Sequence, residues 1–341
     1  MSRQSPPTSG EKESEESSMQ MLLRNEIIEE RMRMIDEFIE EYMDENFGEP
    51  RVLYEAAYHL IRAGGKRIRS LIMLLACESV GGKICDALPL ALAAELLQTA
   101  SLIHDDIIDD DSLRRGVKTV HEVFGVKMAI LAGDLLISLA VRLLGKHGSP
   151  RLLEHMGEGG SRMCEGEATD LLMSPHHEED FNEEAYLTMI DRKTVAFVEE
   201  ATRTGVLVGG GNDEQMRSLL EYARSLGFAF QIRDDILDVE ENLILSGKTH
   251  HSDLRLRRGN YVVLSALSML DKAGKRALLD SLLNYEAEVI LEMLRKTEAV
   301  QKARRKAQDY VQSAKRALHD SSLGNTRPLT SIADFVLDRV H

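Results

Sequence analysis

Apolar residues recur every three or four positions along most of the chain, which is the spacing of one face of an α-helix. Glycine and proline interrupt this pattern at Gly64-Gly65, Gly148-Ser149-Pro150 and Gly209-Gly210-Gly211, and mark junctions between helices. The pattern predicts helices over residues 19–46, 51–63, 66–80, 86–111, 117–146, 150–173, 180–208, 212–241, 260–271, 273–298, 300–318 and 327–339. No segment alternates convincingly between apolar and polar residues, so the sequence predicts no β-strands.

The predicted helices follow one another through short connections, and no change in composition marks a linker between domains. This pattern favours a single all-α domain over residues 19–341. Residues 1–18 contain Pro6-Pro7 followed by many Glu and Ser residues, which predicts a disordered N-terminal tail. Trp is absent and aromatic residues make up only 5% of the chain, so the core must consist of Leu, Ile, Val, Ala and Met.

Two of the predicted helices carry the same acidic signature, Asp-Asp-x-x-Asp, at residues 105–109 and 234–238. The first and last aspartates of each copy are four residues apart and therefore lie on one helix face. Like charges at this spacing repel each other and weaken a helix, which suggests a site built for cations. One copy alone would fit an exposed acidic patch equally well, but two copies in apolar helices favour a site.

The cation that this site predicts is Mg²⁺, which takes carboxylate oxygens and usually shares them with substrate phosphates. Gln231, Asp234 and Asp238 share one face of the second helix, and Asp105 and Asp109 share a face of the first. Two such helices facing each other would present both carboxylate clusters to one diphosphate. The sequence therefore predicts diphosphate chemistry.

A basic cluster follows the Gly64-Gly65 junction, where Lys66 and Arg69 lie on one face of the next predicted helix. The N-terminus of a helix favours anions through its free N–H groups and its dipole, so this cluster is a candidate phosphate site. The alternative is a capping turn with solvated cations.

Two further basic segments follow the first acidic motif or lie within an amphipathic helix. Arg114 and Arg115 follow the first motif, where they either reach phosphates or stabilise the C-terminus of the predicted helix. Lys193 and Thr194 lie within an amphipathic helix, where Thr194 is either an ordinary helix residue or, with Lys193, a ligand of phosphate oxygens.

The overall composition excludes several classes of function. The formal net charge of -15, without a basic stripe, argues against nucleic acid and against an anionic membrane surface. The three cysteines show no disulfide or metal-ligand spacing, as expected in a reducing compartment. The longest apolar stretch, residues 128–144, is interrupted by Asp134 and Arg142, so no membrane anchor is expected, and neither is a secretory signal. These features predict a cytoplasmic protein.

The segments GGKRIRS (64–70), QTASLIHDDIIDDDSLRRG (98–116), DRKT (191–194) and FQIRDDILD (230–238) resemble those of the trans-isoprenyl diphosphate synthases, the polyprenyl synthetase family. The resemblance runs from about residue 20 to the C-terminus. It implies an all-α isoprenoid synthase fold, in one large helical bundle around a central cavity. It also implies condensation of isopentenyl diphosphate with an allylic diphosphate, three Mg²⁺ ions per active site, and a homodimer.

The resemblance assigns roles to individual residues of this chain. The residues matched to Mg²⁺ binding are Asp105, Asp109 and Asp234, with Asp238 assisting. The residues matched to isopentenyl diphosphate binding are Lys66, Arg69 and Arg115. The residues matched to the allylic diphosphate site are Arg114, Lys193, Thr194, Gln231 and Lys248. The catalytic residues implied in this way are Asp105, Asp109, Asp234 and Lys193.

The chain departs from the family pattern at several substrate-binding positions. Gln98 stands where a histidine is usual, and it keeps a hydrogen-bond donor but cannot become a cation. Arg258 stands where a lysine is usual, which preserves the charge but changes its geometry. Ser70 replaces the usual proline, and His251 opens a segment that usually reads Gly-Ser-Asp. We expect these changes to affect substrate affinity more than the type of reaction.

The residues just before the first acidic motif predict the length of the product. Ala100 and Ser101 lie roughly 6–7.5 Å along the helix from Asp105 on nearly the same face. Aromatic residues at these positions are associated in the family with short products, and both side chains here are small. A tunnel that continues past Leu97 predicts a product longer than C15, with C25 or longer favoured. If Phe124 or Met128 blocks the tunnel, the product would be C20.

Two other functions fit parts of the sequence. A class I terpene cyclase has the same fold, but cyclases typically replace the second aspartate motif and rarely keep the basic pair Lys66 and Arg69. A non-catalytic subunit of a heteromeric synthase is supported only by Gln98 and the altered segment 248–262, and the intact carboxylates oppose it.

Overall fold

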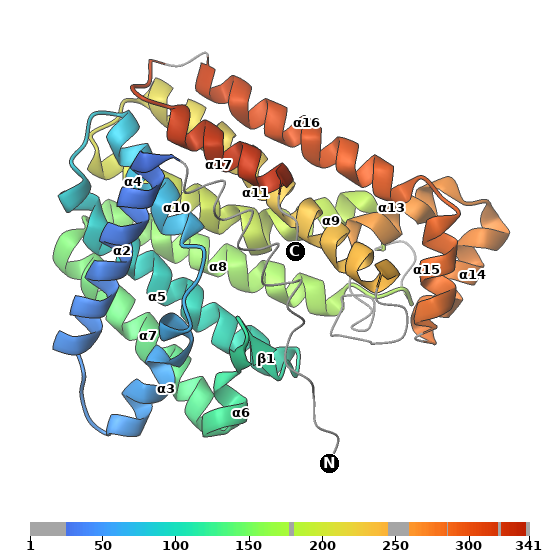
Figure 1. Ribbon diagram of the computed structural model, residues 1–341, viewed down its shortest axis with the longest axis horizontal. Helices are drawn as coiled ribbons and strands as arrows, with labels where there is room; N and C mark the ends of the chain where they lie inside the picture. Colours follow the sequence, from blue (N-terminus) through green and yellow to red (C-terminus); the bar gives the residue numbers. More distant parts are fainter. Residues whose placement is uncertain (1–24, 177–180, 245–258, 285, 320–321, 339–341) are drawn as a thin grey trace. The chain divides into compact units, whose positions relative to one another are not determined.

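The computed structural model of this chain describes residues 25–176, 181–244, 259–284, 286–319 and 322–338 (Figure 1). Its helices are α2 (Glu26–Glu45), α3 (Arg51–Arg62), α4 (Ile68–Ser79), α5 (Ile84–Ile108), α6 (Val120–Phe124), α7 (Val126–His147), α8 (Pro150–Leu172), α9 (Glu183–Ile190), η1 (Asp191–Val195), α10 (Ala196–Val208), α11 (Asp213–Ile244), α13 (Tyr261–Met269), α14 (Lys272–Leu283), α15 (Ala287–Arg295), α16 (Ala299–His319) and α17 (Arg327–Asp338). The prediction of an all-α protein is confirmed.

The elements group into two compact units. The first unit contains the chain up to Gly157, together with Glu200–Leu219 and Ser322–Ser331. The second unit contains Glu158–Glu199, Leu220–Ser321 and the chain from Ile332 onward. Helices α8, α10, α11 and α17 each run from one unit into the other. The single domain over residues 19–341 stays a prediction.

The core of the first unit is built around α5, which packs against α4 and α7. Small residues allow this close packing, because an ideal Cβ on Gly133 of α7 would lie 2.2 Å from Nε2 of His104 on α5. The same imidazole nitrogen lies 3.4 Å from the carbonyl oxygen of Ile130. The packing of α7 therefore fixes the C-terminal half of α5, which carries the first acidic motif.

Two described helices, α5 and α7, are long and apolar enough to cross a membrane by length and composition alone. Length and composition alone are weak evidence for a membrane span. The most apolar stretch of α5 is 67% buried, as in the core helix of a folded protein, whereas that of α7 is only 44% buried. Helix α7 thus leaves an apolar face uncovered.

The second unit has its own apolar core, in which α13 packs against α16 and α9. Ile232, Ile236 and Val239 turn one face of α11 into this core. Asp234 and Asp238 lie on another face of the same helix and are half-buried. The spacing of apolar residues therefore orients the second acidic motif.

Two short strands interrupt the helical pattern, so the prediction of no β-strands is wrong. β1 (Leu113–Arg114) pairs with β2 (Val117–Lys118) in an antiparallel hairpin. Arg115 and Gly116 form its turn, with φ angles of 54° and 75°. Two successive positive φ angles are those of a type I′ turn, which matches the twist of a hairpin.

Several predicted helix boundaries also differ from the structure. The predicted helix 86–111 ends at Ile108, and the predicted helix 117–146 contains β2, α6, a break at Gly125 with φ of 83°, and α7. The predicted helix 66–80 begins only at Ile68, because Arg67 adopts a left-handed conformation. The predicted helix 180–208 consists of α9, the π-helix η1 and α10, and the predicted helix 273–298 consists of α14 and α15.

Candidate active site

The first acidic motif occupies the C-terminal end of α5. Asp105 lies in the last turn, and Asp109 caps the helix by donating its backbone N–H to the carbonyl oxygen of Asp105 at 2.8 Å. Both side chains are half-buried. The structure therefore places these two carboxylates four residues apart across one helical turn, as the sequence predicts.

The middle aspartate of this motif, Asp106, is a site residue that the sequence reading missed. Its side chain is fully buried, and Nε of Arg114 donates a hydrogen bond to its Oδ1 at 2.7 Å. Arg114 also lies 2.9 Å from Asp111. Burial raises the pKa of Asp106, and the charge of Arg114 opposes this rise. The sequence offers only the apolar Ile103, three residues earlier and therefore on the same helix face, as a local signal.

Arg115 connects the hairpin after the first motif to the Gly64-Gly65 loop. Its Nη1 donates a hydrogen bond to the carbonyl oxygen of Leu60 at 3.0 Å and another to that of Gly64. Its guanidinium lies so close to Gly65 that an ideal Cβ there would be 2.9 Å away. Burial, followed by the charge of Arg67, lowers the pKa of Arg115. The structure thus brings Arg115 to the loop that leads into Lys66, whereas the helix-end alternative for Arg114 and Arg115 is wrong.

Arg67 lies between the two predicted substrate ligands Lys66 and Arg69, but its side chain is bonded to other residues of the protein. Its side chain is buried and bonds to Asp36 at 3.0 Å, to Glu95 at 3.0 Å and to the carbonyl oxygen of Ile61 at 3.1 Å. These bonds hold Arg67 in a left-handed conformation, with φ of 48°, that costs a non-glycine residue roughly 1–2 kcal/mol. Charge alone did not distinguish this arginine from its neighbours.

Ser70 joins the same buried network, since its hydroxyl oxygen lies within hydrogen-bond distance of Oε1 of Glu95, at 2.6 Å, and of the carbonyl oxygen of Ala91, at 3.0 Å. The serine that replaces the usual proline is thus a hydrogen-bonded core residue. It ties the first turn of α4 to α5, next to the loop that carries Lys66.

The second acidic motif lies on α11 and repeats the arrangement of the first. Asp234 and Asp238 are half-buried, whereas Asp235 between them is 1% exposed. The carboxylate of Asp235 accepts hydrogen bonds from the Tyr186 hydroxyl at 2.5 Å and from the backbone N–H of Tyr261 at 2.6 Å. Asp235 is therefore already occupied by protein donors, and the sequence reading also missed this role.

Asp235 also connects to two predicted ligands of the allylic diphosphate. The amide of Gln231 donates to Oδ1 of Asp235 at 3.3 Å, and the hydroxyl of Thr194 donates to Oε1 of Gln231 at 2.9 Å. The structure brings Thr194 and Gln231 together, as the sequence predicts. It does so through a chain of hydrogen bonds that ends at a buried carboxylate.

Lys193 lies in the π-helix η1, next to Thr194. Its Nζ is 2.6 Å from Asp170 and 2.7 Å from Glu167, both on α8. Burial lowers the pKa of Lys193, but the charges of Asp170 and Glu167 outweigh burial and raise it above its ordinary value. Lys193 is therefore a fixed cation, held by two carboxylates of α8.

Two glycines allow neighbouring helices to approach this π-helix closely. An ideal Cβ on Gly166 of α8 would lie 2.2 Å from the backbone nitrogen of Lys193. An ideal Cβ on Gly227 of α11 would lie 3.1 Å from Cα of Val195. The backbone of η1 is thus held between α8 and α11, with Lys193 directed at α8 and Thr194 at α11.

The residues predicted to set product length lie on α5 before the first motif. Ala100 is buried, and Leu97, Gln98 and Ser101 are half-buried. The hydroxyl of Ser101 donates to the carbonyl oxygen of Gln98 at 2.9 Å. Lys248 and Arg258, predicted to bind substrate, lie outside the described residues.

The donor chemistry of the two motifs fits Mg²⁺. Each motif offers two half-buried carboxylates at one helix face, and Mg²⁺ is usually bound by one or two carboxylates with waters and substrate phosphates. Within the described part of the chain, no group of three or more His, Cys, Asp or Glu side chains forms a self-contained metal cluster. This donor set suits an ion that arrives with a diphosphate.

Comparisons with known proteins agree with this chemistry. The sequence profile of the polyprenyl synthetase family matches residues 50–298. The chain is 37% identical to a short chain isoprenyl diphosphate synthase of Methanothermobacter thermautotrophicus, over 91% of this chain and 98% of that protein. It is 34% identical to a geranylfarnesyl diphosphate synthase of Aeropyrum pernix, over 90% of this chain and 99% of that protein.

A solved structure extends the likeness to the fold. The crystal structure of a geranylgeranyl pyrophosphate synthetase from Pyrococcus horikoshii matches with a TM-score of 0.81 and 35% sequence identity. The match covers 94% of this chain and 99% of that one. The all-α isoprenoid synthase fold expected from the sequence is therefore confirmed.

Proposed function

The chain belongs to the polyprenyl synthetase family, and from this premise we propose roles for its two acidic motifs and the basic residues beside them. The protein is a magnesium-dependent trans-prenyltransferase that joins isopentenyl diphosphate to an allylic diphosphate and makes chains of C20 or longer. The observation that carries the proposed roles is the repeated arrangement of two half-buried aspartates around a buried, hydrogen-bonded one.

Asp105, Asp109 and Asp234, assisted by Asp238, would hold the Mg²⁺ ions, of which we propose three. When bound, these ions neutralise the charge that builds up on a departing diphosphate. Lys193 adds a positive charge that its carboxylate neighbours keep fixed. Thr194 and Gln231 would orient the diphosphate through their hydrogen-bonded pair.

The reaction follows from this arrangement of charge. The allylic C–O bond breaks, and its electron pair leaves with the diphosphate. The double bond of isopentenyl diphosphate attacks the allylic carbon and forms the new C–C bond, after which a proton is lost to the released diphosphate. Water must be excluded during this step because it would trap the allylic cation.

We propose that isopentenyl diphosphate binds to Lys66, Arg69 and Arg115. The contact of Arg115 with the Gly64-Gly65 loop supports this assignment, because it places that arginine next to the residue that precedes Lys66. Gln98 would contribute a neutral donor. Following the family pattern, Lys248 would bind the allylic diphosphate and Arg258 would bind substrate.

We propose a product of C25 or longer. Ala100 is buried and small, so α5 offers no bulky side chain directly below the first motif. The relative from Aeropyrum pernix is named as a geranylfarnesyl diphosphate synthase, which makes a C25 product. A C20 product is the alternative, as in the geranylgeranyl pyrophosphate synthetase of Pyrococcus horikoshii.

We propose that the protein is a homodimer whose interface includes α7. Val126, Ile130, Ile137 and Val141 lie on one face of this helix at helical spacing, and each is between 39% and 52% exposed. A long apolar stripe of this kind marks an interaction surface, and a second copy of the chain covers such a stripe symmetrically.

We also propose a cytoplasmic location. The cysteines are free, which supports this proposal.

The proposed function is tested by incubating the purified protein with labelled isopentenyl diphosphate, an allylic primer and Mg²⁺. We expect labelled polyprenyl diphosphates, and no product when the metal is chelated. Cyclic hydrocarbons from an allylic substrate alone would indicate a terpene cyclase. Binding without turnover would indicate the non-catalytic subunit.

A further inference from the structure

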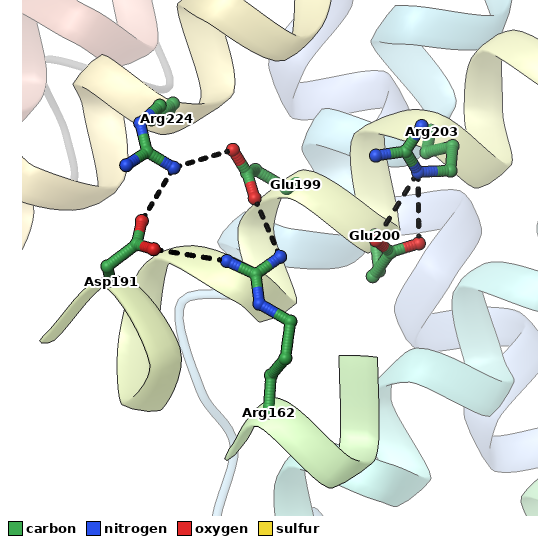
Figure 2. Close-up of polar contacts among 6 residues, drawn as sticks. All are labelled: Arg162, Asp191, Glu199, Glu200, Arg203 and Arg224. Atoms are coloured by element: carbon green, nitrogen blue, oxygen red, sulfur yellow. Dashed lines mark hydrogen bonds and ion pairs between the residues drawn. The ribbon is translucent and has the colours of Figure 1, made fainter. Parts of the chain in front are cut away.

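Four charged side chains form a closed ring of contacts at the start of the π-helix η1 (Figure 2). Arg162 lies 3.3 Å from Asp191 and 3.2 Å from Glu199. Arg224 lies 2.6 Å from Asp191 and 3.4 Å from Glu199. Each acid therefore faces both arginines, and each arginine faces both acids. We call these four residues the charge ring.

The charge ring connects four helical elements of the second unit. Arg162 comes from α8, Asp191 is the first residue of η1, Glu199 lies on α10, and Arg224 lies on α11. None of these residues belongs to the predicted substrate ligands. The ring therefore requires an explanation separate from direct substrate binding.

A π-helix depends on contacts outside itself, because its i→i+5 hydrogen bond is rare and occurs mostly as single turns at functional sites. Here the backbone N–H of Ala196 donates to the carbonyl oxygen of Asp191, five residues earlier. Asp191 thus closes the π turn with its backbone and joins the charge ring with its side chain. Fixing this side chain fixes the residue on which the π turn depends.

The ring is also held in place from outside. The guanidinium carbon of Arg224 lies 5.3 Å from the centroid of the Phe228 ring, and Phe228 stacks on Tyr310 with 5.0 Å between the ring centroids. The side chains of Asp191 and Glu199 are only 22% and 11% exposed, so solvent screens their charges incompletely. A preorganised, partly buried network of this kind contributes more than an isolated surface pair.

The position of η1 decides where two proposed ligands of the allylic diphosphate point. Lys193 and Thr194 are the third and fourth residues of this five-residue π-helix, and they reach α8 and α11 respectively. If the turn reverted to an α-helix, both side chains would rotate relative to Asp170 and Gln231. The charge ring opposes this change by attaching Asp191 to α8 and α11 at the same time.

We propose that Asp191, held by Arg162 and Arg224, is a positioning residue that keeps Lys193 and Thr194 directed at the allylic diphosphate. The inference rests on the proposed function and extends it to residues that do not touch substrate. It implies that weakening the ring impairs the allylic substrate selectively. Isopentenyl diphosphate, assigned to Lys66, Arg69 and Arg115 in the first unit, would bind as before.

The test compares Asp191→Asn with Arg203→Gln. Figure 2 also draws the ion pair formed by Arg203 and Glu200 on α10, at 3.2 Å. Arg203→Gln removes this contact, which is of a similar kind but does not involve η1. We expect Asp191→Asn to raise KM for the allylic diphosphate about tenfold and to change KM for isopentenyl diphosphate less than about twofold. Arg203→Gln should leave both constants within about twofold of the wild type.

A second readout uses the protein without substrate. Amide hydrogen exchange of residues 191–196 should be about tenfold faster in Asp191→Asn and unchanged in Arg203→Gln. If Asp191→Asn does not fold, Arg224→Gln, at a half-exposed position, takes its place with the same expected results. Combining Asp191→Asn with Arg224→Gln should add little to either change, because both weaken one network.

Equal effects of Asp191→Asn and Arg203→Gln on the allylic KM and on amide exchange would overturn the inference. So would an equal rise in KM for both substrates, which would indicate a general disturbance. Absence of prenyl transfer in the wild type contradicts the proposed function instead, and the exchange measurement still decides whether the charge ring holds the π turn.

Discussion

Asp106 and Asp235 hold the same middle position in their respective acidic motifs, and both side chains are buried, at 0% and 1% exposure. Asp106 bonds to Arg114, and Asp235 bonds to Tyr186 and to the backbone of Tyr261. Each motif thus combines a buried aspartate that fixes the local structure with two half-buried aspartates that remain at the surface of the helix. In each Asp-Asp doublet, one aspartate therefore stabilises the local structure, and the other is a proposed metal ligand.

This division predicts opposite outcomes for neighbouring substitutions. Asp106→Asn should lower the free energy of unfolding by about 1–3 kcal/mol, because Arg114 then loses its ion pair with this buried carboxylate. Asp105→Asn should leave stability nearly unchanged and reduce kcat on the order of a hundredfold or more, through loss of a metal ligand. Thermal unfolding and steady-state kinetics separate the two. A stable Asp106→Asn variant would contradict the structural role.

Lys193 and its two carboxylate neighbours predict a dependence of stability on pH. In Lys193→Gln, Asp170 and Glu167 lose the cation that they share, and two charged carboxylates three residues apart on one helix then repel each other. Protonation of a carboxylate at low pH removes this repulsion. We therefore expect the variant to be closer to the wild type in melting temperature at pH 5 than at pH 8.

The matched control for this prediction is the double variant Lys193→Gln, Asp170→Asn, which removes one of the two carboxylates. Its melting temperature should depend less on pH than that of the single variant. In the wild type, the raised pKa of Lys193 keeps it protonated even above its ordinary pKa of 10.5. A loss of activity near pH 8 that disappears in Lys193→Arg would contradict this assignment.

The contact of Gly65 with Arg115 predicts a selective effect on the second substrate. A Cβ added at Gly65 would lie 2.9 Å from the Arg115 guanidinium and must displace it. Gly65→Ala should therefore raise KM for isopentenyl diphosphate about tenfold and change KM for the allylic diphosphate little. Gly160→Ala is the control, because nothing lies within 4 Å of the added atom. The same KM change in both variants would refute the role of Arg115.

Spacing located the outer aspartates of both motifs because an i, i+4 relation within a helix is a local property of the sequence. It did not separate Asp106 and Asp235 from them, since burial depends on tyrosine and arginine partners that are distant in sequence or lie beyond the helix end. Arg67 shows the same limit, because its partner Glu95 is 28 residues away.

Local conformation was hardest to predict where non-local contacts determine it. The hairpin turn places Arg115 in a left-handed conformation that arginine rarely adopts, and only Gly116 gave a signal for it. The π-helix depends on Gly166 and Gly227 and on the arginines Arg162 and Arg224, which come from other helices. Helical periodicity alone therefore predicted an uninterrupted α-helix through Asp191.

The small side chain of Ala100 predicts control of product length by volume. Ala100→Phe should shorten the product, and Ala100→Leu should give an intermediate length, because a larger buried side chain fills more of the space below the first motif. Chain-length analysis of the labelled products measures both. An unchanged distribution in the two variants would refute the proposed tunnel along α5.

The apolar stripe on α7 predicts that one charge separates the proposed dimer. Ile130 is 45% exposed, so Ile130→Glu should cost little stability in the isolated chain but should place a charge in the apolar centre of the interface. Sedimentation analysis should show a dimer for the wild type and a monomer for the variant. Leu172→Glu is the matched control, because Leu172 on α8 is 78% exposed and lies outside the stripe. A dimer that survives Ile130→Glu would place the interface on another surface, whereas a monomeric wild type would exclude the homodimer itself.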